Sequence, residues 1–231
     1  MFRFKQFTLH QDRTAMKVCT DACVLGAYAD VAGEHILDIG TGTGLLALMA
    51  AQRNPLATID AIEVDEEAFG QATGNIADTT FADRVRVWHG RVQEFASPQR
   101  YDRVLTNPPF YTNHLRSPDA AANRALHTDE LPFAELIKAV ERLLKPDGQW
   151  WVLLPPYETE RLTKLAAAVG LTPFRQLHLR HNDRKPVFRI ITGFACRQQP
   201  MSTNTLTIYE SDSNMYTPAF RALLRDFYLV F

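Results

Sequence analysis

Short runs of β-branched and aliphatic residues alternate with longer stretches of helical spacing between residues 35 and 170. This alternation is typical of a mostly parallel sheet whose connecting helices cover both faces. We expect strands at 35–39, 57–64, 84–89, 101–106 and 149–155, and helices at 44–53, 66–76, 131–145 and 158–170. Pro146-Asp147-Gly148 is expected to end the helix at 131–145, because proline and glycine terminate helices.

The chain changes character after residue 170. Residues 174–197 read as two strands around a charged turn that contains Pro186. This pattern predicts an antiparallel hairpin. With the five earlier strands, the hairpin gives an α/β fold with a seven-stranded, mostly parallel sheet.

Three glycines follow the first expected strand in the sequence DIGTGTGLL: Gly40, Gly42 and Gly44. Glycine lets the backbone turn tightly and come close to a ligand. The G-x-G-x-G spacing differs from the G-x-G-x-x-G of dinucleotide-binding loops. Asp38 precedes the loop and can orient it or meet a cationic group. An ordinary tight turn is the alternative interpretation of these glycines.

The second expected strand ends near Glu63. A carboxylate at the tip of this strand is placed to accept hydrogen bonds from both hydroxyls of a ribose. A strand precedes the glycines and a helix follows them, and this context together with Glu63 predicts a nucleoside cofactor site.

The fourth expected strand ends in the sequence TNPPFY at 106–111. Two consecutive prolines make a rigid turn, because each lacks an N–H and has a fixed φ. The turn is expected at the sheet edge that carries the glycine loop, where open α/β sheets bind ligands. The side-chain carbonyl of Asn107 and the backbone carbonyl of Pro108 can accept both protons of one amine, and Phe110 can stack on its ring. The turn therefore predicts a binding site for a planar group that carries an amine.

These motifs resemble a known family. DIGTGTG and NPPF resemble motifs of the class I S-adenosylmethionine-dependent methyltransferases that act on planar amide or amine nitrogens. The segments FRFKQFTLHQDRTAMKVCTDACVLGAYA, IDAIEVDEEAFGQATGNI and NMYTPAFRALLRDFYL resemble the bacterial tRNA adenine-N6 methyltransferases that modify a valine tRNA. The resemblance extends over nearly the whole chain. It implies a Rossmann-like class I methyltransferase fold, S-adenosylmethionine as cofactor, no metal, and methylation of the adenosine just 3′ of the anticodon, position 37.

The resemblance also assigns roles to residues and segments. It implies catalytic roles for Asn107, Pro108, Pro109 and Phe110, and cofactor-binding roles for Thr20, Asp21, Asp38, Gly40, Gly42, Gly44, Glu63, Val92 and Asn107. The Thr20-Asp21 pair matches the motif expected near the methionine end of the cofactor. We expect a single domain over residues 1–231, with residues 1–34 packing on the cofactor site and residues 171–231 forming the hairpin and tail.

The chain departs from the family pattern at three positions. Arg91 stands where many relatives carry an acid that contacts the adenine amine of the cofactor, and an arginine cannot accept a hydrogen bond. Adenine recognition is then expected to depend on backbone groups around Val92 and on apolar stacking. Ala22 replaces the usual glycine after Thr20-Asp21, and Phe110 stands where tyrosine is commoner.

A net charge of −1 argues against nucleic-acid binding through overall charge, but it leaves room for a local basic patch. Residues 171–197 hold six Arg or Lys against the single acid Asp183. We expect four of these cations to contact the tRNA backbone: Arg180, Arg184, Lys185 and Arg189. A solvated hairpin face is the alternative interpretation.

The chain opens without an apolar leader and contains no apolar stretch near the ~18 residues of a membrane helix. Its three cysteines are too few and too unevenly spaced for a disulfide framework. We therefore expect a cytoplasmic protein without a membrane segment. No sequence feature calls for an obligate protein partner, and a monomer is expected.

Three other functions share some of these features. Protein glutamine-N5 methyltransferases have the same type of turn, but they usually carry a helical domain before the glycine loop. Ribosomal RNA guanine-N2 methyltransferases often read N-P-P-F, but they typically carry an additional methyltransferase-like domain. A non-catalytic relative that binds RNA is a further alternative, which Arg91 leaves open.

Overall fold

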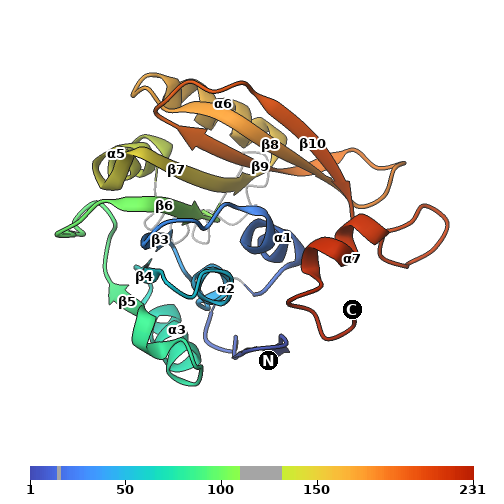
Figure 1. The fold of residues 1–231 in the computed structure, drawn as a ribbon, viewed down its shortest axis with the longest axis horizontal. Coiled ribbons are helices and arrows are strands. Elements are labelled where there is room, and N and C mark those ends of the chain that lie inside the picture. Colours follow the sequence, from blue (N-terminus) through green and yellow to red (C-terminus); the bar gives the residue numbers. More distant parts are fainter. Residues whose placement is uncertain (15–16, 110–131) are drawn as a thin grey trace, which may run out of the picture.

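The computed structural model describes residues 1–14, 17–109 and 132–231 (Figure 1). An eight-stranded sheet with the order β10-β8-β9-β7-β6-β3-β4-β5 forms its centre. Its strands are β3 (His35–Ile39), β4 (Thr58–Glu63), β5 (Val85–His89), β6 (Tyr101–Thr106), β7 (Leu144–Leu154), β8 (Thr172–Arg180), β9 (Val187–Ala195) and β10 (Ser202–Thr207). Of these described strands, β9 runs antiparallel to both of its neighbours and the others pair in parallel. The predicted mostly parallel α/β fold is confirmed.

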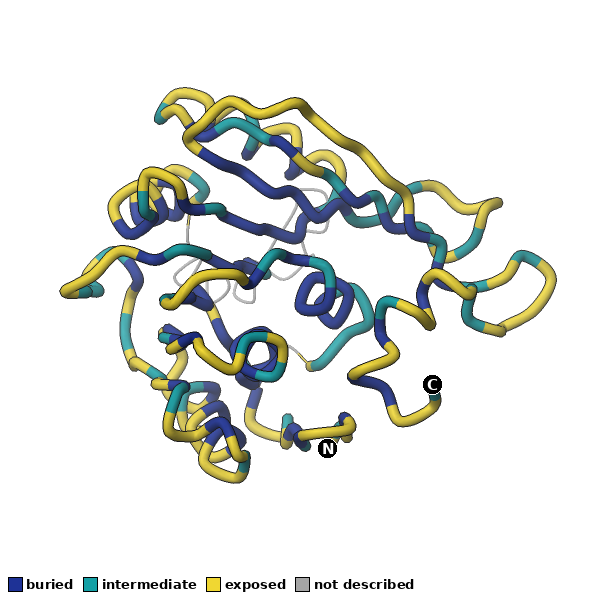
Figure 2. Tube along the Cα trace, in the orientation of Figure 1, coloured by how far each residue is buried: buried dark blue, intermediate teal, exposed yellow. Residues whose placement is uncertain are grey.

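Helices cover both faces of this sheet. Among the described residues they are α1 (Thr20–Tyr28), α2 (Leu45–Arg53), α3 (Glu66–Ala77), α5 (Phe133–Leu143), α6 (Pro156–Ala167) and α7 (Pro218–Leu224), with a short 3-10 turn, η1, at Ala82–Arg84. One hydrophobic cluster joins α1 and α2 to Ile36 and Trp151, and the other joins α5 and α6 to Leu37 and Trp150. Neighbouring strand residues thus enter opposite clusters, as the pleat requires. The inner strands accordingly carry long buried runs, as does the start of α2 (Figure 2).

The predicted boundary between helix 131–145 and strand 149–155 is wrong by several residues. The helix α5 ends at Leu143, and β7 begins directly at Leu144. Leu144 pairs with Tyr101 and Gln149 pairs with Arg103, so residues 145–148 form an irregularity in the ladder. The helix ends three residues before Pro146, and the chain re-enters the sheet through a bulge, where an absent proline N–H is tolerated.

The predicted count of seven strands is also wrong. An eighth strand, β10, pairs in parallel with β8 at the edge of the sheet. Four of its six residues are exposed at its start, Ser202–Thr205. Edge strands of this kind lack the apolar alternation by which strands are recognised in a sequence. A separate two-stranded sheet joins β1 (Phe2–Arg3) to β2 (Thr8–Leu9).

The two chain ends lie side by side in the folded protein (Figure 1). Phe4 forms an antiparallel bridge with Tyr228, and the Lys5 ammonium donates to the backbone carbonyls of Arg225 and Phe231 at 2.6 and 2.8 Å. The tail after α7 therefore holds the N-terminal segment in place. In the described parts of the chain, none of the helices combines the length and the apolar character needed to cross a membrane.

Candidate active site

The glycine loop connects β3 to α2 with three left-handed residues. Gly40, Gly42 and Gly44 have φ values of 71°, 57° and 87°, a region that side chains of other residues rarely occupy. A Cβ added to Gly40 or Gly42 would meet no atom within 4 Å. These two glycines therefore leave open space in front of the loop. A Cβ added to Gly44 would instead lie 3.5 Å from Ile76, so this third glycine faces the protein.

The backbone of the loop is tied to β4. The N–H groups of Gly40 and Thr41 donate to the Ile62 carbonyl at 2.9 and 3.0 Å. The Gly42 N–H donates to Glu63 Oε2 at 2.8 Å, and the Gly44 N–H donates to the Thr41 carbonyl at 2.9 Å. The loop thus provides a fixed shape rather than a set of donors aimed at an anion.

Asp38 supports the loop from inside the protein. It is fully buried, and its Oδ2 accepts from the Thr41 hydroxyl at 2.6 Å and from the Ala47 N–H at 3.2 Å. Burial, with a smaller effect from the charge of Glu63, raises the pKa of the Asp38 carboxyl to about 7. Asp38 does not belong to the described lining of the cavity below.

Glu63 occupies the tip of β4, and 8% of its surface is exposed. Its Oε1 accepts from the N–H groups of Val64 and Asp65 at 2.9 and 3.0 Å, in addition to the bond between Oε2 and Gly42. A carboxylate offers about four lone-pair sites. The three backbone bonds therefore orient Glu63 and leave it able to accept a further hydroxyl proton.

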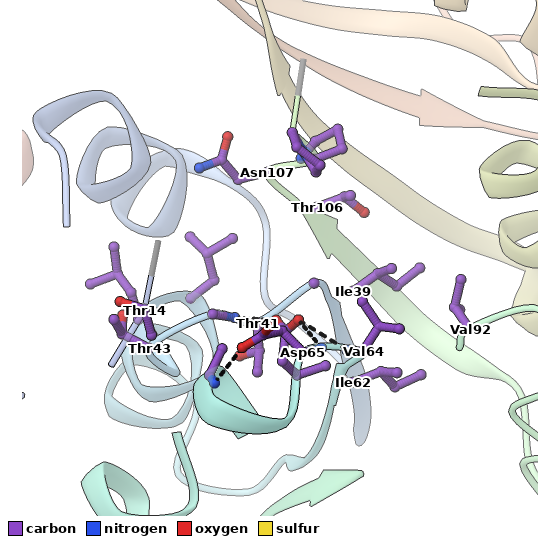
Figure 3. A pocket seen from close by; sticks show the side chains of 18 of the residues that line it. Thr14, Ile39, Thr41, Thr43, Ile62, Val64, Asp65, Val92, Thr106 and Asn107 are labelled. Atoms are coloured by element: carbon purple, nitrogen blue, oxygen red, sulfur yellow. Dashed lines mark hydrogen bonds between the residues drawn. The ribbon is translucent and has the colours of Figure 1, made fainter. Parts of the chain in front are cut away.

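A cavity of about 620 Å³ lies at the carboxyl edge of the sheet (Figure 3). This volume is in the range of small-molecule sites, about 300–1,000 Å³. The cavity brings together seven residues predicted from the sequence: Gly40, Gly42, Glu63, Val92, Asn107, Pro108 and Pro109. Thr20, Asp21, Asp38 and Gly44 lie outside its described lining. Phe110 lies outside the described residues.

The Asn-Pro-Pro turn follows β6 directly. Thr106, the last residue of the strand, is buried, and its hydroxyl accepts from the Trp150 indole N–H at 3.1 Å. This bond fixes the point at which the chain leaves the sheet. Asn107, Pro108 and Pro109 then line the cavity. In the close-up, Asn107 lies above Thr41 of the glycine loop (Figure 3).

The turn after β5 forms the opposite end of the cavity. Val92 is buried and Arg91 is exposed, and both line the cavity. The Arg142 guanidinium of α5 donates to the backbone carbonyls of Val92 and Phe95 at 2.9 and 2.7 Å. The turn is therefore held rigidly, and the apolar side chain of Val92 belongs to the same buried cluster as Ile39 and Ile62, which also line the cavity (Figure 3).

Thr20 and Asp21 begin α1, just outside the cavity lining. Asp21 Oδ1 accepts from the Ala22 N–H at 3.2 Å, and Asp21 Oδ2 lies 3.0 Å from the Arg189 Nε. Ala22 itself lines the cavity. Asp21 thus contributes to the start of the helix, and Arg189 of β9 holds it in place.

Sequence reasoning missed part of the cavity wall. Thr14, Lys17 and Val18 of the N-terminal segment line it, together with Thr41 and Thr43 of the glycine loop. The sequence shows Lys17 only as one of several cations near the start of the chain. Its place at the cavity depends on contacts between the N-terminal segment and α3, which no local pattern indicates.

The four cations predicted to bind RNA occupy the β8–β9 hairpin, and the described cavity lining includes none of them. Because β8 is parallel to β6 and β7, the hairpin turn lies at the same sheet edge as Asn107. Arg184 pairs with Asp212 at 2.6 Å, and both side chains are exposed. Lys185 is exposed, Arg180 is half-buried, and Arg189 is paired with Asp21.

Within residues 1–14, 17–109 and 132–231, no group of three or more His, Cys, Asp or Glu side chains is arranged to hold a metal ion.

Comparisons with known proteins agree with this geometry. Residues 22–168 match the family model of the methyltransferase small domain. The chain is 50% identical over 236 residues to a Dyadobacter fermentans protein named tRNA1(Val) (adenine(37)-N6)-methyltransferase, covering 100% of this chain and 98% of that one. It is 39% identical to the protein of the same name from Pedobacter heparinus, with the same coverage of both chains.

Solved structures share the fold at low sequence identity. A predicted O-methyltransferase from Agrobacterium tumefaciens superposes with a TM-score of 0.69 at 19% identity, covering 89% of this chain and 96% of that one. A glycopeptide N-methyltransferase in complex with S-adenosylmethionine gives a TM-score of 0.59 at 12% identity, covering 83% and 92%. The predicted family is confirmed: the chain belongs to the methyltransferase small domain family and, within it, to the bacterial tRNA1(Val) (adenine(37)-N6)-methyltransferases.

Proposed function

We propose that this chain transfers a methyl group from S-adenosylmethionine to N6 of adenosine 37 in tRNA1(Val). The observation that carries the proposal is one cavity of about 620 Å³ that joins the glycine loop, Glu63 and the Asn-Pro-Pro turn. The relatives that are 50% and 39% identical over the whole chain bear the name of this activity. The cavity combines a place for a nucleoside cofactor with a holder for a planar amine.

The residues present fit the cofactor. Gly40 and Gly42 leave open space in front of the loop, and Glu63 retains acceptor capacity for ribose hydroxyls. We assign adenine packing to Ile62, Val64 and Val92, because these apolar side chains line the end of the cavity near β5. Asp38 and Gly44 act from behind the loop, and Thr20 and Asp21 shape the adjoining start of α1. The bound cofactor supplies a methyl group that is already activated by its sulfonium.

Asn107 and Pro108 hold the target amine in this proposal. Their carbonyl groups accept hydrogen bonds from the two N–H groups of the adenine N6 amine. These two hydrogen bonds draw the nitrogen lone pair out of conjugation with the ring. The main demand on the protein is then the in-line positioning of nitrogen, carbon and sulfur. The methylated nitrogen is acidic, so it releases one proton to solvent without a dedicated strong base. Pro109 keeps the turn rigid. Phe110, outside the described residues, remains predicted to stack on the base.

The tRNA binds across the carboxyl edge of the sheet, where the β8–β9 turn extends the site. The positive charges of Arg180 and Lys185 can attract the phosphates. Arg184 can release its exposed partner Asp212 and bind a phosphate instead. Arg189 contributes more weakly, because Asp21 already pairs with it. A base in a single-stranded anticodon loop leaves its stack more easily than one in a duplex.

We further propose that residues 1–231 act as one methyltransferase domain and as a monomer in the cytoplasm, where tRNA is available. Thr14 and Lys17 support a role of residues 1–34 in covering the cofactor site, since both line the cavity. Residues 171–231 supply the hairpin and the tail that packs on the N-terminal segment.

Methyl transfer from labelled S-adenosylmethionine to bulk tRNA, taken from a strain that lacks this enzyme, tests the proposal. Digestion to nucleosides should place the label in N6-methyladenosine. Parallel reactions with ribosomal RNA or with a protein substrate in place of tRNA test the alternative enzymes, which would place the label in N2-methylguanosine or in a glutamine side chain. Cofactor binding and tRNA binding without any label transfer would support a non-catalytic RNA-binding protein.

A further inference from the structure

The charged residues of the cavity are divided between its walls. Three carboxylates line the side formed by β4 and the start of α3: Glu63, Asp65 and Glu66. Two cations line the described part of the cavity, Lys17 and Arg91. Arg91 adjoins Val92. Lys17 belongs instead to the N-terminal wall, the part of the lining formed by Thr14, Lys17 and Val18. Thr14 and Val92 lie on opposite sides of the cavity (Figure 3).

The wall that carries Lys17 is fastened to α3 and to the glycine loop. Asn75 of α3 is buried, and its amide bonds the backbone N–H and carbonyl of His10, both at 2.9 Å, and the carbonyl of Thr43 at 2.9 Å. Gln71 Oε1 accepts from the N–H groups of residues 12 and 13, both at 3.1 Å. On the other side of Lys17, the Val18 N–H donates to Gln11 Oε1 at 2.9 Å.

The glycine loop has few donors left for an anion. Gly40, Thr41, Gly42 and Gly44 each donate their N–H to an acceptor within the protein. A carboxylate of a ligand in front of this loop therefore needs a donor from another wall. Lys17 is exposed and lines the cavity, and within the described ranges no carboxylate pairs with its ammonium.

We propose that Lys17 binds the α-carboxylate of the methionine moiety of the cofactor. The inference rests on the proposed function, which places the nucleoside between Glu63 and Val92. The amino-acid end of the cofactor then extends along the glycine loop to the N-terminal wall. Its carboxylate is the single anionic group of the cofactor, and the ammonium of Lys17 provides its charge-assisted hydrogen bond.

Two ligands that differ in this carboxylate test the proposal without any turnover. S-Adenosylhomocysteine carries the α-carboxylate and α-ammonium, whereas 5′-methylthioadenosine keeps adenine, ribose and a thioether but lacks both. Calorimetric titration of Lys17→Gln should show S-adenosylhomocysteine affinity reduced about 10- to 100-fold, as for loss of a charge-assisted bond. Affinity for 5′-methylthioadenosine should stay within about twofold of wild type. Lys17→Arg should recover most of the lost affinity.

Two control variants show whether the loss of S-adenosylhomocysteine affinity is specific to the α-carboxylate. Arg91→Gln makes the same charge change at the opposite end of the cavity, and it should leave the preference between the two ligands unchanged. Glu63→Ala should weaken both ligands, because both contain the ribose.

Equal weakening of both ligands by Lys17→Gln would overturn the proposal, as would unchanged binding of S-adenosylhomocysteine together with a higher KM for tRNA. The second result would assign Lys17 to the RNA. Wild-type protein that binds neither ligand would contradict the proposed function itself, so the two failures are distinguishable.

Discussion

Arg189 Nε lies 3.0 Å from Asp21 Oδ2, and this ion pair joins β9 to the start of α1 beside the cavity. The side chains are 24% and 12% exposed, so the pair is shielded from solvent more than the surface pair of Arg184 and Asp212. The finding gives Arg189, predicted as an RNA contact, a second role in holding α1.

We expect Arg189→Ala to lower the free energy of unfolding by about 1–3 kcal/mol, because it leaves the largely buried Asp21 carboxylate without this partner. Arg184→Ala is the matched control. The free energy of unfolding of Arg184→Ala should stay within about 0.5 kcal/mol of the wild-type value, since exposed ion pairs contribute little to stability. Urea unfolding of both variants measures the difference. Equal stability of the two variants would show that the Asp21–Arg189 pair has no structural role.

The hairpin should contribute to tRNA affinity through counterion release. We expect Arg184→Ala/Lys185→Ala to raise the KM for tRNA and to leave the S-adenosylhomocysteine affinity unchanged. The slope of log affinity against log salt should flatten by roughly 0.7–0.9 for each phosphate that the variant no longer neutralises. Binding measured from low to moderate salt tests this. Parallel lines for the variant and wild type would remove the hairpin turn from the RNA interface.

Asn107 should act on the target amine more strongly than on the cofactor. Asn107→Ala should lower kcat more than about tenfold, as expected for a buried hydrogen bond worth ~1–3 kcal/mol. Its affinity for S-adenosylhomocysteine should stay close to that of wild type, and this binding measurement is also the control for folding. A variant that retains more than about a tenth of the wild-type kcat would contradict the role of Asn107.

The pKa of Asp38 predicts a pH dependence of stability. Burial raises this pKa from 3.8 to about 7, so between pH 4 and pH 7 the folded protein holds a proton that the unfolded chain releases. The contribution of Asp38 to the free energy of unfolding therefore falls as pH rises through that window, by up to about 1.4 kcal/mol per pH unit. Asp38→Asn removes the titration.

Urea unfolding of wild type and Asp38→Asn at several pH values checks this prediction. The stability of wild type relative to the variant should decrease from pH 4 to pH 7 and become constant above pH 7. An identical pH dependence of the two proteins would show that Asp38 titrates normally.

The sequence indicates those parts of the site that local patterns determine. The places of Gly40, Gly42 and Glu63 could be predicted because the glycines follow one recognisable strand and Glu63 ends the next, and parallel strands bring their carboxyl ends to one edge. The proline pair likewise identified the turn at Asn107 without any tertiary information.

Features that depend on distant contacts could not be predicted in this way. The bulge at residues 145–148 follows from the pairing of β7 with Tyr101 and Arg103. β10 is an exposed edge strand that lacks an apolar pattern. Lys17 reaches the cavity because Gln71 and Asn75 hold the N-terminal segment, and each of these bonds joins residues far apart in the chain.

Methylation of a defined transcript tests the central claim most directly. Unmodified tRNA1(Val) and the same transcript with guanosine in place of adenosine 37 are each incubated with the protein and S-adenosylmethionine. Mass spectrometry of nuclease fragments then locates the methyl group. We expect N6-methyladenosine at position 37 of the first transcript and no methylation of the second. Equal methylation of both transcripts, or of neither, would contradict the proposed function.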